Sequence, residues 1–385
     1  MTIGASGRAT WTGSDATGAP APAGVWQPVA CYERGMSGAG VDALRRVAFL
    51  FERALEPTYR VRAFRTAAAA IDALPPGELA RRMADGTLQE LPGVGATTAG
   101  VVVEAERGQT PAYLRDAEAL SWAPPEVVAG AGARLRAALK GDCHAHSDWS
   151  DGGSPIREMA LAARDLGHEW MVLTDHSPRL TVANGLTAER LRRQLDVVRE
   201  LNDELAPFRI LTGIEVDILE DGSLDQDAGL LAELDVVVAS VHSKLRMPSK
   251  DMTPRMVAAI ANPATDVLGH CTGRYVTPRG RSGKTRPESE FDAEIVFEAC
   301  RQFGVAVEVN SRPERQDPPR RLLRLAVEMG CLFSIDTDAH APGQLDWQVL
   351  GCARAEECGV PVERVINTKS AQELLSWEHR IVGSS

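Results

Sequence analysis

The sequence predicts an α/β protein whose parallel strands follow a small all-α domain. After residue 140, short apolar runs rich in β-branched residues alternate with helical patterns. Strands separated by helices are joined by crossovers, which gives either a parallel barrel or a doubly wound sheet. Before residue 140, apolar residues recur at helical spacing instead. The seven predicted strands are 141–147, 170–176, 209–217, 236–243, 266–270, 305–310 and 332–340.

Length and charge limit the classes of protein. The chain has 385 residues, 44% of them hydrophobic and 25% charged, which indicates two or three globular domains and excludes disorder throughout. Residues 1–140 hold 15 basic and 14 acidic residues, whereas residues 141–385 hold 27 and 39. The net charges of +1 and −12 exclude a basic surface over the whole molecule, although a local basic surface in the first third stays open.

Cysteine usage and hydropathy favour a soluble, cytoplasmic protein with no membrane partner. The seven cysteines form no CxxC pair, which is typical of reduced proteins. The first 22 residues lack the apolar core of a signal peptide, and no segment approaches the roughly 18 apolar residues of a membrane span.

The pattern along the chain predicts four segments. Residues 1–39 are rich in Gly, Ala, Ser, Thr and Pro without periodicity, so we expect a disordered tail. Apolar residues at helical spacing predict a helical domain over 40–110. A proline-containing stretch predicts a linker with one helix over 111–140. Residues 141–385 then form the α/β domain.

Histidine and acidic residues gather at the C-terminal ends of the predicted strands. In a parallel barrel these ends form one mouth, where active sites are built. Of eight histidines, only His168 and His379 fall elsewhere, and we expect both at the surface. The candidate metal ligands are His144, His146, Asp151, His176, Glu215, His242, His270, Asp338 and His340.

These residue types predict a cluster of divalent ions. His144 and His146 point to the same face of a strand because side chains alternate with period two. Imidazole with carboxylate suits Zn, Mn or Fe, and nine ligands are too many for one tetrahedral ion. Clustered ions clamp the oxygens of a phosphoryl displacement, so phosphoester hydrolysis is the first hypothesis. Carbon–nitrogen hydrolases usually place a lysine where this chain has Glu215. Cys143 and Cys271 are expected to be packing residues.

The strand-end motifs resemble those of the polymerase and histidinol phosphatase (PHP) domain, in the version carried by bacterial family X DNA polymerases. The resemblance covers 141–377 and implies a distorted (β/α)7 barrel with three metal ions, usually Mn or Zn. One ion would take His144, His146, Glu215 and Asp338, a second Glu215, His242 and His270, and a third Asp151, His176 and His340. The motifs are HAHSDWSDG, LTDHS, GIEVDI, SVHS, GHCTGR, VEVNSRPERQD and DTDAH.

A glycine hairpin in the helical domain predicts a second function. In LQELPGVGATTAGVVVEA (88–105), Gly93, Val94 and Gly95 form a tight turn whose exposed amides can hold a DNA phosphate. The block resembles the helix-hairpin-helix domain at the N-terminus of family X polymerases, which implies DNA as a partner. Packing alone is the alternative interpretation of the hairpin, and a solvated face is the alternative for the nearby arginines, which are residues 45, 46, 53, 60, 62, 65, 81 and 82.

Two departures from the polymerase pattern limit the resemblance. Only about 30 residues separate the two blocks, which is less than the roughly 50 residues of the smallest domains, so no polymerase palm fits between them. Thr97 and Val101 stand where the family places lysines, and residues 1–139 contain none. Schiff-base lyase chemistry by a lysine of this block is therefore excluded.

The sequence thus predicts a metal-dependent phosphoesterase that acts on nucleic-acid ends, as a 3′-5′ exonuclease or a DNA-repair end-processing enzyme. Glu215 and Asp338 are expected at the reacting centre. Arg274 is the first candidate for a phosphate anchor, with Asn310 and Arg312 behind it, and a salt bridge at the barrel rim is the alternative for Arg274. The rival hypotheses are a small-molecule phosphatase of histidinol-phosphate type and a DNA-binding scaffold whose metals only stabilise the barrel.

Overall fold

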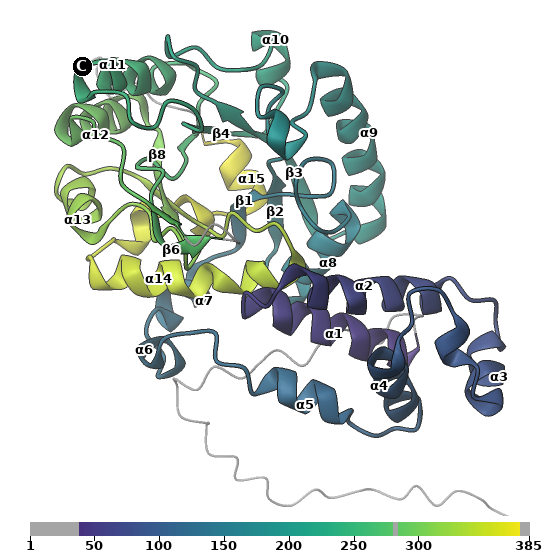
Figure 1. Cartoon of the computed structure of the whole chain (residues 1–385). Helices are drawn as coiled ribbons and strands as arrows, with labels where there is room; N and C mark the ends of the chain where they lie inside the picture. Colours follow the sequence, from purple (N-terminus) through teal and green to yellow (C-terminus); the bar gives the residue numbers. More distant parts are fainter. Residues whose placement is uncertain (1–37, 280–283, 378–385) are drawn as a thin grey trace, which may run out of the picture.

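The computed structural model describes residues 38–279 and 284–377, which form a helical block followed by an α/β barrel (Figure 1). The predicted tail lies outside these residues except for Gly38 and Ala39, and Ala39 is the first residue of helix α1. None of the described helices combines the length and the apolar composition that crossing a bilayer requires.

The helical block is built around α1, whose apolar residues recur every three or four positions. Leu44, Val47 and Phe51 are buried, and they pack with Phe64 of α2 and Val102 of α4. The rings of Phe51 and Phe64 meet edge to face at 5.6 Å. The helices of this block are α1 (Ala39–Arg53), α2 (Thr58–Asp72), α3 (Glu78–Asp85) and α4 (Ala96–Glu106), with the short turn η1 (Leu88–Glu90) before α4.

Residues 111–140, where we expect a linker with one helix, contain three short helices. Leu135 of α7 is fully buried in the largest apolar core of the barrel. The Glu356 carboxylate accepts hydrogen bonds from the backbone amides of Gly132 and Leu135 at 3.0 and 2.9 Å. The end of this segment therefore packs as part of the barrel. The three helices are α5 (Ala112–Glu118), α6 (Pro125–Val128) and α7 (Ala133–Ala138).

The barrel strands lie in the order β1-β2-β3-β4-β5-β8-β9, and every neighbouring pair is parallel. A parallel bridge between Ala145 and Ala339 brings the two edges of the sheet together, so the barrel is nearly closed. The seven predicted strands and the barrel fold are confirmed. They are β1 (Gly141–Ala145), β2 (Trp170–Leu173), β3 (Arg209–Asp217), β4 (Val236–Ser240), β5 (Val267–Leu268), β8 (Ala306–Asn310) and β9 (Phe333–Asp336).

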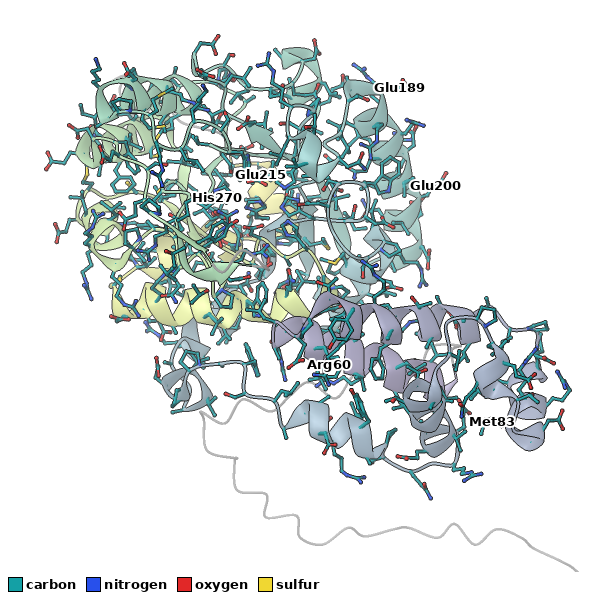
Figure 2. The ribbon with its side chains drawn as sticks, viewed as in Figure 1. Arg60, Met83, Glu189, Glu200, Glu215 and His270 are labelled. Atoms are coloured by element: carbon teal, nitrogen blue, oxygen red, sulfur yellow. The ribbon has the colours of Figure 1, made fainter. Side chains whose placement is uncertain are left out.

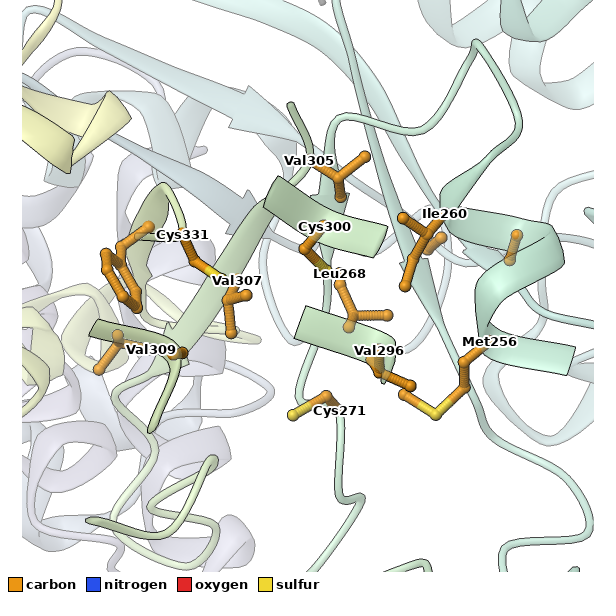
Figure 3. Close-up of a cluster of buried hydrophobic side chains, with 14 of the residues drawn as sticks. Met256, Ile260, Leu268, Cys271, Val296, Cys300, Val305, Val307, Val309 and Cys331 are labelled. Carbon is orange, nitrogen blue, oxygen red and sulfur yellow. The ribbon is translucent and has the colours of Figure 1, made fainter. Parts of the chain in front are cut away.

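Helices cover the outside of the barrel, and a hairpin of β6 (Tyr275–Arg279) and β7 (Lys284–Arg286) follows β5. Figure 3 shows one stretch of the core, where Leu268 and Val307 of the strands face Met256 and Val296 of the covering helices. The outer helices are α8 (Ile156–Asp165), α9 (Ala188–Leu205), α10 (Ala228–Leu231), α11 (Ser249–Ile260), α12 (Ala293–Phe303), α13 (Arg320–Glu328), α14 (Gln348–Glu357) and α15 (Ala371–Leu375), with the 3-10 segment η4 (Pro342–Trp347) before α14.

The six described cysteines are buried and free. Cys271 lies in the largest apolar core, and Cys143 lies in the smaller cluster around Trp170. Both residues therefore pack in the core, as the sequence predicts.

Candidate metal centre

The nine predicted ligands all lie at or just beyond the C-terminal ends of barrel strands. The strand bodies are largely buried, and the C-terminal ends of parallel strands meet at one mouth, which brings the ligands of different strands together. His144 belongs to β1 and Glu215 to β3, and the other seven ligands lie in the loops that follow the strands. Figure 2 shows Glu215 and His270 close together inside the barrel.

Glu215 occupies the middle of the cluster, and its two oxygens face different imidazoles. Oε1 lies 2.7 Å from Nε2 of His270 and 3.2 Å from Nε2 of His242. Oε2 lies 2.9 Å from Nδ1 of His176 and 3.2 Å from Nε2 of His144. A carboxylate between two sets of nitrogens is the arrangement that lets one side chain serve two ions.

A second group of ligands lies at the mouth of the barrel, and we call it the mouth group. Its members are His146, Asp151, His176 and His340. Oδ1 of Asp151 is 3.5 Å from Nε2 of His176 and 3.4 Å from Nε2 of His340. The ring of His146 stacks between them, 4.5 Å from the ring of His176 and 4.3 Å from that of His340. The Asp151 side chain is 33% exposed, so this group is the part of the centre that opens to solvent.

Asp338 completes a third group with His144 and His146. Its backbone has a positive φ of 51°, which few residues other than glycine adopt and which is typical of functional positions. Nε of Arg315 lies 3.0 Å from Asp338 Oδ2, and Nη1 of Arg312 lies 3.4 Å from Oδ1. The strained turn therefore holds the carboxylate between two buried arginines and the histidines.

The three groups overlap more than the resemblance implies. His146 belongs both to the group of Asp338 and to the mouth group, and His176 shares a group with Glu215 and His242. His270 belongs to none of the three groups and contacts Glu215 directly. The assignment of each ligand to one ion stays a prediction.

The ligand atoms fit bound cations. Buried nitrogens and oxygens normally have hydrogen-bond partners. Among the described residues, several buried atoms of the predicted ligands have none. They are Nε2 of His144, both ring nitrogens of His146 and His242, Nδ1 of His176 and His270, and Oε2 of Glu215.

The two central carboxylates of the cluster are anions at neutral pH. Burial alone would raise the pKa of Glu215, but the neighbouring imidazoles, His144 first, hold it well below its ordinary value. Burial likewise opposes ionisation of Asp338, and Arg312 and Arg315 lower its pKa well below the ordinary value. Burial lowers the pKa of His146 well below its ordinary value, so this ligand is neutral. Anionic carboxylates and neutral imidazole are the forms that bind metal.

The sequence analysis missed two residues that support this centre. Glu308 of β8 is fully buried, and its Oε1 lies 2.7 Å from Nδ1 of His144. Arg315 contacts Asp338 and also lies 4.8 Å above the Tyr275 ring. The spacing of the two arginines in SRPER is the only signal for Arg315, and an alternating apolar strand hides Glu308.

The predicted phosphate anchors lie at different depths. All three nitrogens of the Arg274 guanidinium donate to the protein, to Glu288 and to the carbonyls of Arg315 and Gln316. This arrangement supports the salt bridge at the rim. Arg312 and Asn310 instead reach the centre, and the Asn310 amide donates to Asp338 Oδ2 at 3.2 Å.

The hairpin has the predicted geometry of a turn followed by a helix. Gly93 has a φ of +86°, and Gly95 is the extended N-cap of α4, with its amide donating to Oγ1 of Thr98 at 2.9 Å. Both glycines are exposed, whereas the Val94 side chain is buried in the helical core. The Val94 amide donates to the Leu91 carbonyl at 3.0 Å, so Val94 holds the turn together from inside.

Most of the nearby arginines pair with acids of this protein. Arg62 is exposed. Within the helical block, Arg45 pairs with Asp72, Arg60 with Glu56, and Arg81 and Arg82 with Glu78. Arg65 pairs with Glu52 and with Glu158 of the barrel, and Arg53 with Asp346 of the barrel.

The expectation that His168 is a surface residue is wrong. Its side chain is buried, and Nε2 lies 3.1 Å from Oε1 of Gln348. Gln348 lies 180 positions away in the sequence, so no local pattern indicates that His168 has a buried partner. His379 lies outside the described residues.

Two family models match the chain, a helix-hairpin-helix domain over residues 39–110 and a PHP domain over residues 142–312. The predicted PHP domain and helix-hairpin-helix domain are confirmed. Seven of the nine predicted ligands lie within the stretch that the PHP model matches, and Asp338 and His340 lie beyond it.

Three known proteins illustrate the relationship. The chain is 42% identical over 242 residues to "DNA polymerase/3'-5' exonuclease PolX" of Bacillus subtilis, a match covering 63% of this chain and 41% of that protein. The chain thus spans about two fifths of that polymerase. A probable phosphatase of Thermoanaerobacter sp. (strain X514) is 28% identical over 255 residues, covering 63% of this chain and 96% of that protein. A histidinol phosphate phosphatase structure from Lactococcus lactis, complexed with zinc, L-histidinol and phosphate, matches at 18% identity and a TM-score of 0.42, over 57% of this chain and 94% of that chain.

Proposed function

We propose that this protein hydrolyses phosphate esters at nucleic-acid ends, as a 3′-5′ exonuclease or a DNA-repair end-processing enzyme with three divalent ions, Mn or Zn with Fe as a further candidate. The observation that carries the proposal is the position of the Glu215 carboxylate between two sets of imidazoles, beside the mouth group of Asp151 and His340. Such ions, when bound, activate water and neutralise charge on a phosphoryl group.

The side chains of this protein have distinct roles in the proposed reaction. Glu215 and Asp338 hold the cations as anions, and their low pKa values mean that neither carboxyl group has to lose a proton when a cation binds at neutral pH. Arg312 and Arg315 are buried beside Asp338 and are the nearest cations to stabilise charge developing on phosphate. Arg274 stays a predicted anchor, with its rim contacts supporting the structural alternative.

DNA is the proposed partner of the helical block. The helix-hairpin-helix match and the exposed residues Gly93 and Gly95 before α4 support binding to a phosphate backbone. The relative from Bacillus subtilis, named as a 3′-5′ exonuclease, supports a DNA end as the substrate. The free state of the described cysteines agrees with the reducing cytoplasm, where we place the reaction.

A small-molecule phosphatase of histidinol-phosphate type is the second candidate. It is favoured by the internal ion pairs of most arginines in the helical block, which leave less charge for a DNA backbone. The probable phosphatase of Thermoanaerobacter also matches over nearly its whole length.

The test is an activity panel with the full chain and Mn²⁺. The substrates are 3′-labelled single-stranded DNA, nicked duplex, abasic duplex and histidinol phosphate, and Glu215→Ala is the inactive control. Release of the 3′ label at rates well above those for histidinol phosphate supports the proposal. Faster release of phosphate from histidinol phosphate favours the second candidate, and DNA binding with no hydrolysis of any ester identifies a scaffold.

A further inference from the structure

The C-terminal end of α1, in the helical block, packs against the barrel segment that follows the last metal ligand. This segment, η4, begins two residues after His340. We propose that Glu52 of α1 is a positioning residue for His340, so that the helical block completes the metal centre instead of only presenting a substrate to it. The inference uses the metal centre of the proposed function and is independent of its substrate.

Glu52 links three parts of the molecule. Its Oε2 accepts a hydrogen bond from the backbone amide of Gly343 at 2.9 Å. Nε and Nη2 of Arg65 donate to the same carboxylate at 2.9 and 2.8 Å, and Nη1 of Arg65 reaches Glu158 of α8 at 3.2 Å. Glu52 is 5% exposed, so its charge is balanced by these contacts and not by water.

The backbone of η4 lies directly against α1. A Cβ atom on Gly343 would lie 2.0 Å from the carbonyl oxygen of Phe49 and 2.9 Å from Cβ of Glu52. Contacts below 3.0 Å are not tolerated, and here the nearest atom belongs to the backbone of a helix. Glycine at this position therefore permits the close approach that brings its amide to Glu52.

Gly343 lies only three positions after the ligand His340. The chain from His340 to Gly343 spans at most about 10 Å, so a shift of η4 is passed to His340 with little slack. Oε1 of Gln344, the next residue of η4, accepts a hydrogen bond from the backbone amide of His340 at 2.8 Å. The His340 carbonyl accepts a hydrogen bond from the backbone amide of Gly153 at 2.6 Å. Gly153 follows Asp151, whose carboxylate lies 3.4 Å from His340 Nε2. Two ligands of the mouth group, Asp151 and His340, thus depend on the position of η4.

A second set of contacts holds the other end of η4. Nη1 of Arg53 pairs with Asp346 at 2.9 Å, with exposed fractions of 6% and 7%, and Nε1 of Trp347 donates to the Arg53 carbonyl at 2.9 Å. The Arg312 guanidinium lies 5.6 Å above the Trp347 ring and donates from Nη1 toward Nδ1 of His340 at 2.9 Å. The helical block therefore contacts both ends of η4. One end of η4 is joined to His340 through Gln344, and the other through Trp347 and Arg312.

The expected effect is selective. Residues that orient a metal ligand from behind change affinity by about 10- to 100-fold when mutated. Loss of the Glu52 carboxylate frees the Gly343 amide and loosens His340, which serves the mouth group alone. His242 and His270 follow β4 and β5 and are expected to keep their geometry.

The test is Mn²⁺ binding to the metal-stripped full chain, measured by equilibrium dialysis and by electron paramagnetic resonance. Glu52→Ala should weaken one ion by about 10-fold or more and leave the others at wild-type affinity. Glu52→Gln should recover most of the loss, because its amide oxygen still accepts from Gly343. Asp72→Asn is the matched control, since it breaks an ion pair of the same block that has no contact with η4, and it should bind like wild type.

A wild-type isotherm for folded Glu52→Ala, or equal weakening of every ion, overturns the inference. If Glu52→Ala does not fold, Glu52→Asp keeps the charge but withdraws the carboxylate from the Gly343 amide, and it should weaken the same ion to a smaller extent. Unchanged binding by that variant then overturns it. Binding is measured without substrate, so a protein with the expected isotherms and no esterase activity would refute the proposed function alone.

Discussion

Nδ1 of His144 lies 2.7 Å from Oε1 of Glu308, and both side chains are fully buried. The other oxygen of Glu308 accepts a hydrogen bond from the backbone amide of His270, so one carboxylate contacts two predicted ligands, His144 and His270. When Nδ1 of His144 carries the proton and donates it to Glu308, the lone pair that can bind metal is on Nε2. Nε2 lies 3.2 Å from Oε2 of Glu215. Glu308 therefore selects the tautomer that can bind metal.

We expect Glu308→Gln to lower the affinity for the ion at His144 by about 10-fold, because the neutral amide stabilises the imidazole ligand less than a carboxylate does. Mn²⁺ titration of the metal-stripped protein measures this change. The control is Glu298→Gln, which removes a half-exposed partner of Arg301 on α12. Equal affinities in the two variants would show that Glu308 only fills space.

Glu215 and His144 should differ in what their loss removes. Glu215 faces imidazoles with both oxygens, so Glu215→Ala leaves neighbouring cations without a shared anion and should lose more than one metal equivalent and nearly all activity. His144→Ala should lose about one equivalent, and excess Mn²⁺ should restore part of its rate. Elemental analysis and rates at saturating metal separate the two results. Full metal content with a wild-type rate in Glu215→Ala would exclude the shared ligand.

The sequence predicted the barrel and its ligands because both follow from local patterns. Apolar runs between helices define the strands, and strand ends of a parallel barrel meet at one mouth whatever the loops do. His242 and Glu215 could therefore be placed together although 27 residues separate them in the chain. Imidazoles and carboxylates that converge at one mouth are typical of a site for divalent ions.

Contacts between distant segments could not be predicted in the same way. Glu52 lies 291 residues from Gly343, and nothing in the helical pattern of α1 distinguishes its carboxylate from a solvent-facing one. Arg274 illustrates the reverse problem, since a motif arginine at a strand end can turn toward backbone carbonyls such as that of Gln316. Side-chain direction at a rim depends on tertiary packing, which residue types alone do not encode.

The hairpin prediction is best tested at Gly95. A Cβ atom on Gly95 meets nothing within 4 Å, and its φ of −94° suits any residue. Gly93 is unsuitable, because its φ is +86° and a Cβ would lie 2.6 Å from Cγ2 of Thr66. Gly95→Leu should retain the fold and weaken DNA binding by blocking the approach of a phosphate to the amides.

Fluorescence anisotropy at one fixed salt concentration measures this binding, since affinity for DNA depends steeply on salt. Gly100→Leu is the matched control on the same helix, where a Cβ also meets nothing within 4 Å. Equal affinities for folded Gly95→Leu and Gly100→Leu would assign the hairpin to packing.

His168 predicts how stability changes with pH. Burial, followed by the charge of Arg136, lowers the pKa of His168 well below its ordinary value of 6.5. Above pH 7 the residue is neutral in both the folded and the unfolded chain, so it adds no pH dependence. As the pH falls through 6.5, only the unfolded chain takes up the proton, and the free energy of unfolding should fall by up to about 1.4 kcal/mol for each pH unit.

His168→Gln does not titrate and can still reach Gln348. Between pH 7.5 and 5.5 its free energy of unfolding should therefore fall by about 1 kcal/mol less than that of the wild type. Urea unfolding of the two metal-stripped proteins at both pH values measures the difference, and parallel losses would mean that His168 becomes protonated without unfolding.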